Sequence, residues 1–359
     1  MSLSDSLVDI GFGVGWSAVK RLPDPAVDRA FRAMADRAYR KDGRGVRQLR
    51  ANLARVIPDA RSETLDAATR EGMRRYLRYW SEAFRLPAWG ADRVRETFTL
   101  EEGLDHLDAA VAAGTGAVMV VPHSGNWDLA GAWACDRYGG LVTVAERLRP
   151  EGLYDKFVAY RESLGMEVLP HGDDDTFRTL LRRLKSGSLV CLVADRDLSG
   201  SGVPVNFFGD RASMPGGPAL LSLLTGAPLM PVDLWHVDQG VRGRVAPALA
   251  PPTGPSARIS SVWRLASARA ESRSSKPFLW TVDPFRTVSF QAANPTDLSP
   301  DGLPVAPRSG PTPTFRQVVR SRHRSGRCRS GAGGRSSCRG RPTFRAIGRP
   351  SPPSGGLRR

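Results

Sequence analysis

The chain has 359 residues, enough to bury a substantial core in one large domain or two smaller ones. Its formal charge is +16, but residues 251–359 hold 19 arginines and one lysine against four acidic residues, so residues 1–250 carry no net charge. A nucleic-acid partner is therefore not expected for the neutral part. No stretch reaches about 18 consecutive apolar residues, and no basic start precedes a long apolar core, so we expect neither a transmembrane helix nor a signal peptide.

Residues 1–40 are predicted to form a membrane-contacting helical segment. A helix is expected from Asp24, a suitable N-cap, with Pro25 in its first turn. One face of this helix is apolar and basic residues surround it: Val27, Phe31, Met34 and Ala38, with Arg29, Arg32, Arg37 and Arg40. Such a helix lies on an anionic membrane surface, or it packs on the domain with its basic face in solvent. Both interpretations stay open.

Residues 41–250 are predicted to form an α/β domain with a central, largely parallel β-sheet flanked by helices. A helix over 63–86 carries a stripe assigned mostly to the core: Leu65, Met73, Tyr76, Leu77, Trp80 and Phe84. Helical and strand patterns then alternate, which is typical of a parallel sheet. Helices are expected at 101–113, 126–138, 150–164, 174–186 and 216–225, and strands at 117–121, 141–145, 166–169, 189–193 and 229–234.

The segment VVPHSGNWDLAGAW (120–133) places polar residues where a predicted buried strand meets a helix. Ligands of open α/β sheets bind at the carboxyl ends of strands. Four residues separate His123 from Asp128, so an aspartate one turn into the helix is expected to reach the imidazole. Such a pair fixes the ring tautomer and stabilises the imidazolium, and the other ring nitrogen can take a proton from a hydroxyl. A structural histidine is the alternative.

A second polar interruption follows another predicted buried strand. Asp195 comes directly after this strand, beside Arg196 and Asp197. If the strands of Asp195 and His123 are neighbours, both side chains face one site; otherwise the three residues form a surface salt-bridge cluster. Arg161, on a predicted helix, is a candidate for binding a phosphate or pyrophosphate, or else an exposed helix arginine.

Missing motifs exclude several enzyme classes. The sequence has no G-x-S-x-G elbow of the α/β-hydrolases, no P-loop and no Rossmann fingerprint. Cys328 and Cys338 have no histidine or cysteine partners at zinc spacing, so neither a metal nor another cofactor is expected. What remains is a general base that acts on an acceptor hydroxyl.

The segment HSGNWD resembles the motif of the HX4D/E acyltransferases, which include glycerolipid acyltransferases and the lipid A lauroyl/myristoyl acyltransferases. The similarity is strongest to the actinobacterial phosphatidylinositol mannoside acyltransferases and covers roughly residues 1–250. The matching segments are RYWSEAFRLP (78–87), VVPHSGNWDLAGAW (120–133), YRESLGMEVLP (160–170), VADRDLSGSGVPVNFFG (193–209) and MPGGPALLSLLTGAPLMPVDLW (214–235).

The resemblance implies a peripheral enzyme on the cytoplasmic face of the cell membrane. Such an enzyme moves a palmitoyl-type chain from acyl-CoA to a mannose hydroxyl of phosphatidylinositol mono- or dimannoside. His123 matches the family's base, and Asp128 completes its HX4D motif. Asp195 matches a second catalytic acid, usually glutamate, and Arg161 and Ser201 match positions that contact the acyl donor. A lipid A-type lauroyl/myristoyl acyltransferase, or a hydrolase that uses water as acceptor, is the alternative.

Residues 251–359 are rich in arginine, serine, proline and glycine, and we expect them to be disordered. One interpretation is an arginine-rich tail that binds RNA. The other is a segment that is not evolved coding sequence, for instance a shifted reading frame. The simultaneous loss of acidic residues, apolar periodicity and family likeness favours the second.

Overall fold

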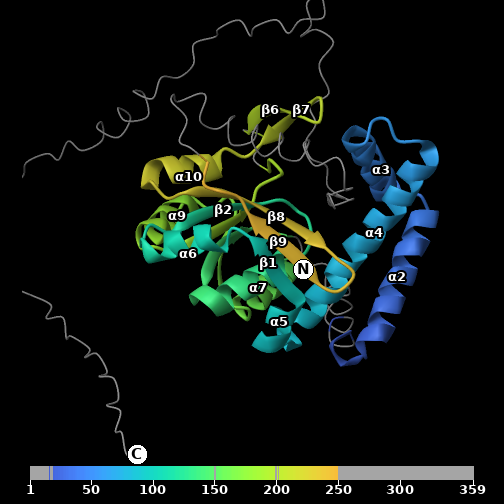
Figure 1. Ribbon diagram of the computed structural model, residues 1–359, viewed down its shortest axis with the longest axis horizontal. Helices are drawn as coiled ribbons and strands as arrows, with labels where there is room; N and C mark the ends of the chain where they lie inside the picture. The colour runs from blue at the N-terminus through green and yellow to red at the C-terminus, as the bar shows by residue number, and fades with distance from the viewer. Residues whose placement is uncertain (1–15, 17–18, 149–150, 199, 201, 250–359) are drawn as a thin grey trace, which may run out of the picture. The chain divides into compact units, whose positions relative to one another are not determined.

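The computed structural model describes residues 16, 19–148, 151–198, 200 and 202–249 (Figure 1). The chain divides into two compact units, Met1–Asn294 and Pro295–Arg359, and all described residues belong to the first. The predicted tail at 251–359 lies outside the described residues.

A seven-stranded sheet forms the centre of the described residues, in the order β1-β9-β8-β2-β5-β3-β4. Its strands are β1 (Phe98–Glu102), β2 (Ala117–Val121), β3 (Leu141–Ala145), β4 (Met166–Pro170), β5 (Leu189–Val193), β8 (Leu229–His236) and β9 (Val241–Val245). The strands from β8 to β4 run parallel, whereas β9 is antiparallel to β8 and parallel to β1. The predicted α/β fold with a largely parallel sheet is confirmed.

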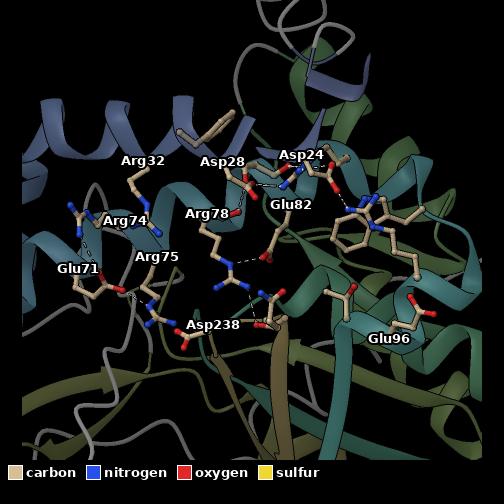
Figure 2. A pocket seen from close by; sticks show the side chains of 18 residues that line it. Asp24, Asp28, Arg32, Glu71, Arg74, Arg75, Arg78, Glu82, Glu96 and Asp238 are labelled. Carbon is tan, nitrogen blue, oxygen red and sulfur yellow. Dashed lines mark hydrogen bonds and ion pairs between the residues drawn. The ribbon is translucent and has the colours of Figure 1, made fainter. Parts of the chain in front are cut away.

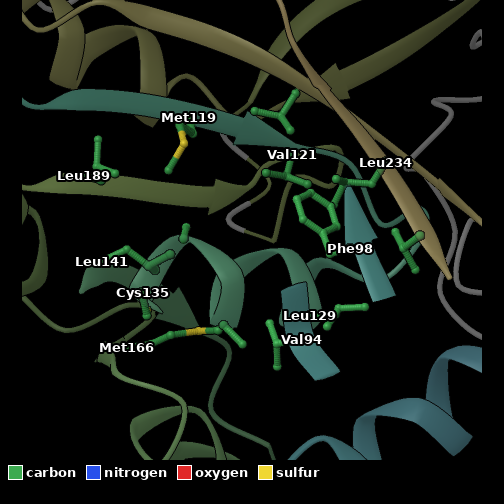
Figure 3. Packing of buried hydrophobic residues seen from close by; sticks show 14 of the residues in the cluster. Val94, Phe98, Met119, Val121, Leu129, Cys135, Leu141, Met166, Leu189 and Leu234 are labelled. Atoms are coloured by element: carbon green, nitrogen blue, oxygen red, sulfur yellow. The ribbon is translucent and has the colours of Figure 1, made fainter. Parts of the chain in front are cut away.

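Different helices cover the two faces of this sheet. Successive residues of a strand point to opposite faces and therefore pack against different helices. The helices are α5 (Ala91–Thr97), α6 (Leu104–Ala112), α7 (Trp127–Tyr138), α8 (Glu151–Glu162), α9 (Thr176–Lys185) and α10 (Gly217–Thr225). Met119 and Val121 of β2 pack in one cluster with Leu129 of α7 (Figure 3). Val118 and Val120 belong to a second cluster with residues of α9 and α10. The expected β2 segment is therefore apolar throughout because both of its faces are covered.

In the described part of the chain, α2 (Asp24–Arg40), α3 (Arg44–Val56), α4 (Ser62–Arg85) and the short 3-10 helix η1 (Leu86–Ala88) come before α5 and the first strand of the sheet. The helices predicted from Asp24 and over 63–86 are confirmed, but Asp24 is the first helical residue of α2 and not its N-cap, a position that Pro23 occupies without a side-chain hydrogen bond. Figure 1 shows α2 alongside α4, and the Phe31 ring of α2 lies 6.3 Å from that of Phe84. Val27 is also buried and Ala38 is half-buried, so most of the apolar face proposed for membrane contact packs on the protein itself, whereas Met34 of that face is 45% exposed. No described helix is long and apolar enough to cross a membrane.

The helix expected over 101–113 is wrong at its start, because residues up to Glu102 belong to β1 and α6 begins at Leu104. Gly103 separates the two with φ +83°, a left-handed conformation that suits glycine. Helices α3 and α5 and strands β1 and β9 were not predicted. The hairpin of β6 (Val203–Phe207) and β7 (Asp210–Met214), which forms its own two-stranded sheet, was also missed.

Candidate active site

The loop between β2 and α7 carries His123 and is anchored at both ends. β2 ends at Val121, and α7 begins after Asn126, whose side-chain oxygen accepts a hydrogen bond from the Leu129 amide at 3.0 Å. Asparagine is a strong N-cap because it satisfies one of the orphan amides of the first turn. The apolar strand and the capped helix therefore hold the loop that separates them.

Gly125 is required in this loop by its conformation and by the space around it. Its φ of +56° lies in the left-handed region. A Cβ at this position would lie 2.8 Å from both the backbone carbonyl carbon and the Cβ of Leu234 in β8. The loop thus lies directly against the neighbouring strand, and no larger side chain fits there without displacing one of the two.

Asp195 meets His123 from the adjacent strand, which is the first of the two arrangements that the sequence left open. β5 pairs with β2 in parallel, with Val193 opposite Val121, so the two residues leave the sheet side by side. Asp195 Oδ1 lies 2.6 Å from His123 Nδ1, and its Oδ2 accepts from the His123 amide at 3.1 Å. Burial opposes the charge of Asp195, but the attraction and hydrogen bonds of His123 outweigh it and lower the pKa of this carboxyl.

Asp128 does not make the contact that its spacing predicted. It is 1% exposed, and its two oxygens accept hydrogen bonds from Tyr79 Oη at 2.7 Å and from Arg161 Nε at 2.8 Å. No hydrogen bond or ion pair joins it to His123 in the described part of the chain. Asp128 lies on the face of α7 that meets α4 and α8, so the phase of the helix directs it away from the imidazole.

Arg161 is a buried partner of Asp128 and not an exposed helix arginine. Although burial disfavours its charge, Asp128 raises the pKa of the Arg161 guanidinium above its usual value. The same side chain lines the cavity beside His123. The structure therefore brings together four of the five predicted site residues, and the fifth, Ser201, lies outside the described residues.

A cavity of about 380 Å³ lies beside His123. Its aromatic lining consists of Tyr76, Tyr79, Trp80, Trp127, Tyr154 and Phe157, and its polar lining includes His123, Arg161, Glu146 and Arg196. Trp127 links the two parts, since its ring lies 4.1 Å from that of Tyr79 and 5.1 Å from that of His123. The sequence assigned the aromatic stripe of α4 mostly to the core. Trp80 does pack against the core, and both Tyr76 and Trp80 also line this cavity. A cavity of this size, mostly apolar with a few polar groups, is typical of a small-molecule site.

Glu82 of α4 is a buried charge that the sequence did not single out. Its Oε2 accepts from Asn126 Nδ2 at 2.9 Å and lies 3.2 Å from Nε2 of His236, while Oε1 accepts from Arg78 at 2.7 Å. Burial opposes the charge, but His236, Arg78 and Asn126 together lower the pKa of Glu82 to about 2. The only sequence signal for Glu82 was its place inside RYWSEAFRLP (78–87), one of the segments that carry the family resemblance.

A larger cavity, about 740 Å³, lies along α4 beside α2 and does not include His123 in its lining (Figure 2). Six arginines and six carboxylates line it, and many of them neutralise each other. Arg85, for example, pairs with Asp24 at 2.7 Å and Asp28 at 2.8 Å, and Arg75 pairs with Glu71 at 2.8 Å. The smaller cavity therefore carries the candidate chemistry.

The His123–Asp195 pair is able to act as a general base. A carboxylate at Nδ1 favours the tautomer with a proton on that nitrogen, which leaves Nε2 free to accept one. The buried carboxylate also stabilises the imidazolium that forms when Nε2 takes the proton of a hydroxyl. Fold and site together define an α/β protein with a histidine–aspartate pair at the strand ends, beside an aromatic cavity.

Comparison with known proteins specifies the class. Residues 5–257 match the family model of the bacterial lipid A biosynthesis acyltransferases, and the chain belongs to this family. Phosphatidylinositol mannoside acyltransferases of two Mycobacterium tuberculosis strains are each 45% identical to it over 285 residues, covering 78% of this chain and 88% of theirs. That of Mycolicibacterium smegmatis is 46% identical over 249 residues, covering 69% and 81%. The predicted enzyme class, an acyltransferase, and the predicted resemblance are confirmed.

Proposed function

We propose that this chain transfers a palmitoyl-type fatty acyl group from acyl-CoA to a mannose hydroxyl of phosphatidylinositol mono- or dimannoside. The relatives named as phosphatidylinositol mannoside acyltransferases match most of the chain, which supports this acceptor over lipid A. The observation that carries the chemistry is the 2.6 Å contact of His123 with Asp195 at the wall of an aromatic cavity.

In the proposed reaction, His123 Nε2 removes the proton of the mannose hydroxyl while Asp195 stabilises the resulting imidazolium. The hydroxyl oxygen attacks the thioester carbonyl carbon, which forms a C–O bond and a tetrahedral oxyanion. Collapse of this intermediate breaks the C–S bond, and the departing CoA sulfur takes the proton from the imidazolium. The products are the acylated mannoside and free CoA, and His123 returns to its neutral form.

Other groups are proposed to orient the substrates. Arg161, held by Asp128, contacts the acyl donor through its charge, and Ser201 keeps the same proposed role. Asp128 thus acts through Arg161 and Tyr79 rather than through the imidazole. The oxyanion needs hydrogen-bond donors, and backbone amides around the HSGNWD turn are the proposed ones. The proposed steps use no metal or further cofactor.

The enzyme is further proposed to work as a peripheral protein on the cytoplasmic face of the cell membrane. Its acceptor is a membrane lipid, so the protein must reach the membrane surface. Most of the apolar face of α2 is packed on the protein, so the exposed arginines of α2, together with the exposed Met34, are the groups proposed to meet the membrane surface and its anionic headgroups. Arg29 and Arg37 are two of them.

The direct test is to incubate the full chain with palmitoyl-CoA, with and without mannosylated phosphatidylinositol. We expect an acylated mannoside, and CoA release that depends on the acceptor. Equal CoA release without acceptor would identify a hydrolase. A parallel reaction with a lipid A precursor tests the other acceptor, and faster acylation of that lipid would overturn the proposed substrate.

A further inference from the structure

Glu82 occupies the junction of three elements around the His123 loop. It projects from α4, is 5% exposed, and lines the larger cavity rather than the one beside His123 (Figure 2). Both of its oxygens are used: Arg78 binds Oε1, and Asn126 and His236 meet Oε2. A charge buried this deeply is costly unless such partners compensate it.

Asn126 connects this carboxylate to the loop. Its Nδ2 donates to Glu82 at 2.9 Å, while its Oδ1 accepts from the Leu129 amide at 3.0 Å. The side-chain amide of Asn126 is fully buried and thus connects α4 to the first turn of α7. Asn126 lies three residues after His123. Its orientation is fixed, because a flipped amide would place an oxygen against the carboxylate.

The Glu82 carboxylate also helps to hold β8, the strand against which the His123 loop lies. His236 ends β8, and its backbone carbonyl accepts from Arg75 at 2.8 Å. Arg78, the partner of Glu82 Oε1, also donates to the carbonyls of Val237 at 2.6 Å and Gly240 at 3.1 Å. These contacts fix the β8–β9 turn to α4. Since Gly125 lies directly against Leu234 of β8, the loop is confined from both sides.

We propose that Glu82 is a positioning residue for acyl transfer, which acts through Asn126 to hold the loop of His123 in register with Asp195. This inference rests on the proposed function, with His123 as the base. Glu82 itself does not line the smaller cavity, and it has no hydrogen bond to the His123 imidazole in the described residues. Its effect is therefore expected on the rate of the chemical step and not on binding of the acyl donor.

The first test compares Glu82→Gln with Asn126→Ser and with the double variant. Glutamine keeps the shape of Glu82 but replaces one acceptor oxygen by a donor, and serine keeps an N-cap but lacks an amide to donate to Glu82. We expect each variant to lower kcat by about 10- to 100-fold, as outer-shell substitutions typically do. KM for palmitoyl-CoA should stay within about two-fold of its original value, and the double variant should lose no more than the worse single variant, because both act on one connection.

The matched control is Glu96→Gln, since Glu96 is an exposed carboxylate that lines the same larger cavity (Figure 2). It should keep the original kcat. Three results would overturn the inference: Glu82→Gln within two-fold of the original kcat, an equal loss in the Glu96 variant, or multiplied losses in the double variant. Rates are measured well below the melting temperature of each variant, so that unfolding does not contribute.

A second readout needs no substrate and so separates this inference from the proposed function. The Nδ1 proton of His123, deshielded by its short hydrogen bond to Asp195, is expected to give a downfield proton NMR signal that is absent in His123→Gln. We expect Glu82→Gln to broaden or shift this signal, and Glu96→Gln to leave it unchanged. An unaltered signal in Glu82→Gln would contradict the positioning role even if no acyl transfer is found.

Discussion

At the scale of single residues, the two aspartates of the site hold different partners. Asp195 binds the His123 ring, whereas Asp128 binds Tyr79 and Arg161. In the proposed mechanism, the first contact supports the base, and the second holds Arg161 and Tyr79 in the cavity wall. The two carboxylates are therefore expected to affect different kinetic parameters.

Asp195→Asn should lower kcat by about 10²- to 10⁴-fold, because a neutral amide no longer stabilises the imidazolium or fixes the tautomer. Its KM for palmitoyl-CoA should change little.

Asp128→Asn should instead raise the KM for palmitoyl-CoA and reduce the free energy of unfolding by about 3 kcal/mol, since it leaves the buried charge of Arg161 uncompensated. Steady-state kinetics and urea unfolding of both variants check these expectations. A pure kcat defect in Asp128→Asn, with unchanged stability, would show that Asp128 serves the base after all.

Glu82 predicts a pH dependence of stability. Its pKa falls from the usual 4.5 to about 2 in the folded protein, so the folded state holds the proton less tightly than the unfolded chain. Its stabilisation is complete above pH 4.5 and is lost as the pH falls toward 2, by about 3 kcal/mol in total. We expect the difference in unfolding free energy between the original chain and Glu82→Gln to shrink over this window. A constant difference from pH 6 to pH 3 would contradict the charged state of Glu82.

At the scale of elements, the loop between β2 and α7 depends on its fit against β8. Gly125→Ala should destabilise the protein by about 1–3 kcal/mol and lower kcat, because both the positive φ and the 2.8 Å approach to Leu234 oppose a Cβ. Gly172→Ala is the matched control, since Gly172 has φ +82° and no atom lies within 4 Å of the place where its Cβ would be. It should share the cost of the backbone conformation but keep kcat. An equal loss of kcat in Gly125→Ala and Gly172→Ala would show that the close approach to Leu234 is not what lowers kcat.

Helix α2 offers a test of membrane contact. Its arginines Arg29 and Arg37 are exposed while most of its apolar face is buried, so binding to a membrane would be mainly electrostatic. Reversing both charges, in Arg29→Glu with Arg37→Glu, should weaken binding to phosphatidylglycerol vesicles at least about 10-fold at low salt. Arg182→Glu, at an exposed position of α9, serves as control. Unchanged vesicle sedimentation of the double variant would exclude α2 as the contact.

At the scale of the whole molecule, burial on both faces made the central strands predictable. β2 and β5 are uninterrupted apolar runs, and their parallel pairing placed His123 beside Asp195 as expected. β1 and β9 lie at one edge of the sheet and alternate apolar with polar residues, for example Arg242 and Arg244. Such short segments lack the continuous pattern on which the prediction rested.

Parts of the site were hidden from the sequence for physical reasons. A four-residue spacing does not fix the phase of a helix, so Asp128 was assigned to the wrong partner. A glutamate among helical aromatic residues is normally a solvent-facing residue, and only packing of α4 against α7 and β8 makes Glu82 a buried anchor. The same packing makes Trp80, which packs against the core, part of the cavity wall as well. These roles arise from contacts between elements far apart in the chain.

His123 is proposed to be the base for acyl transfer to a mannose hydroxyl, and every other proposed role in the site depends on it. The most direct measurement is the rate of transfer from palmitoyl-CoA to mannosylated phosphatidylinositol by His123→Ala, with His106→Ala, on α6 outside both cavities, as the matched histidine control. If His123 is the base, His123→Ala is expected to lose at least about 10³-fold in kcat, while His106→Ala keeps the original rate. Transfer by His123→Ala within a few-fold of the original rate would contradict it.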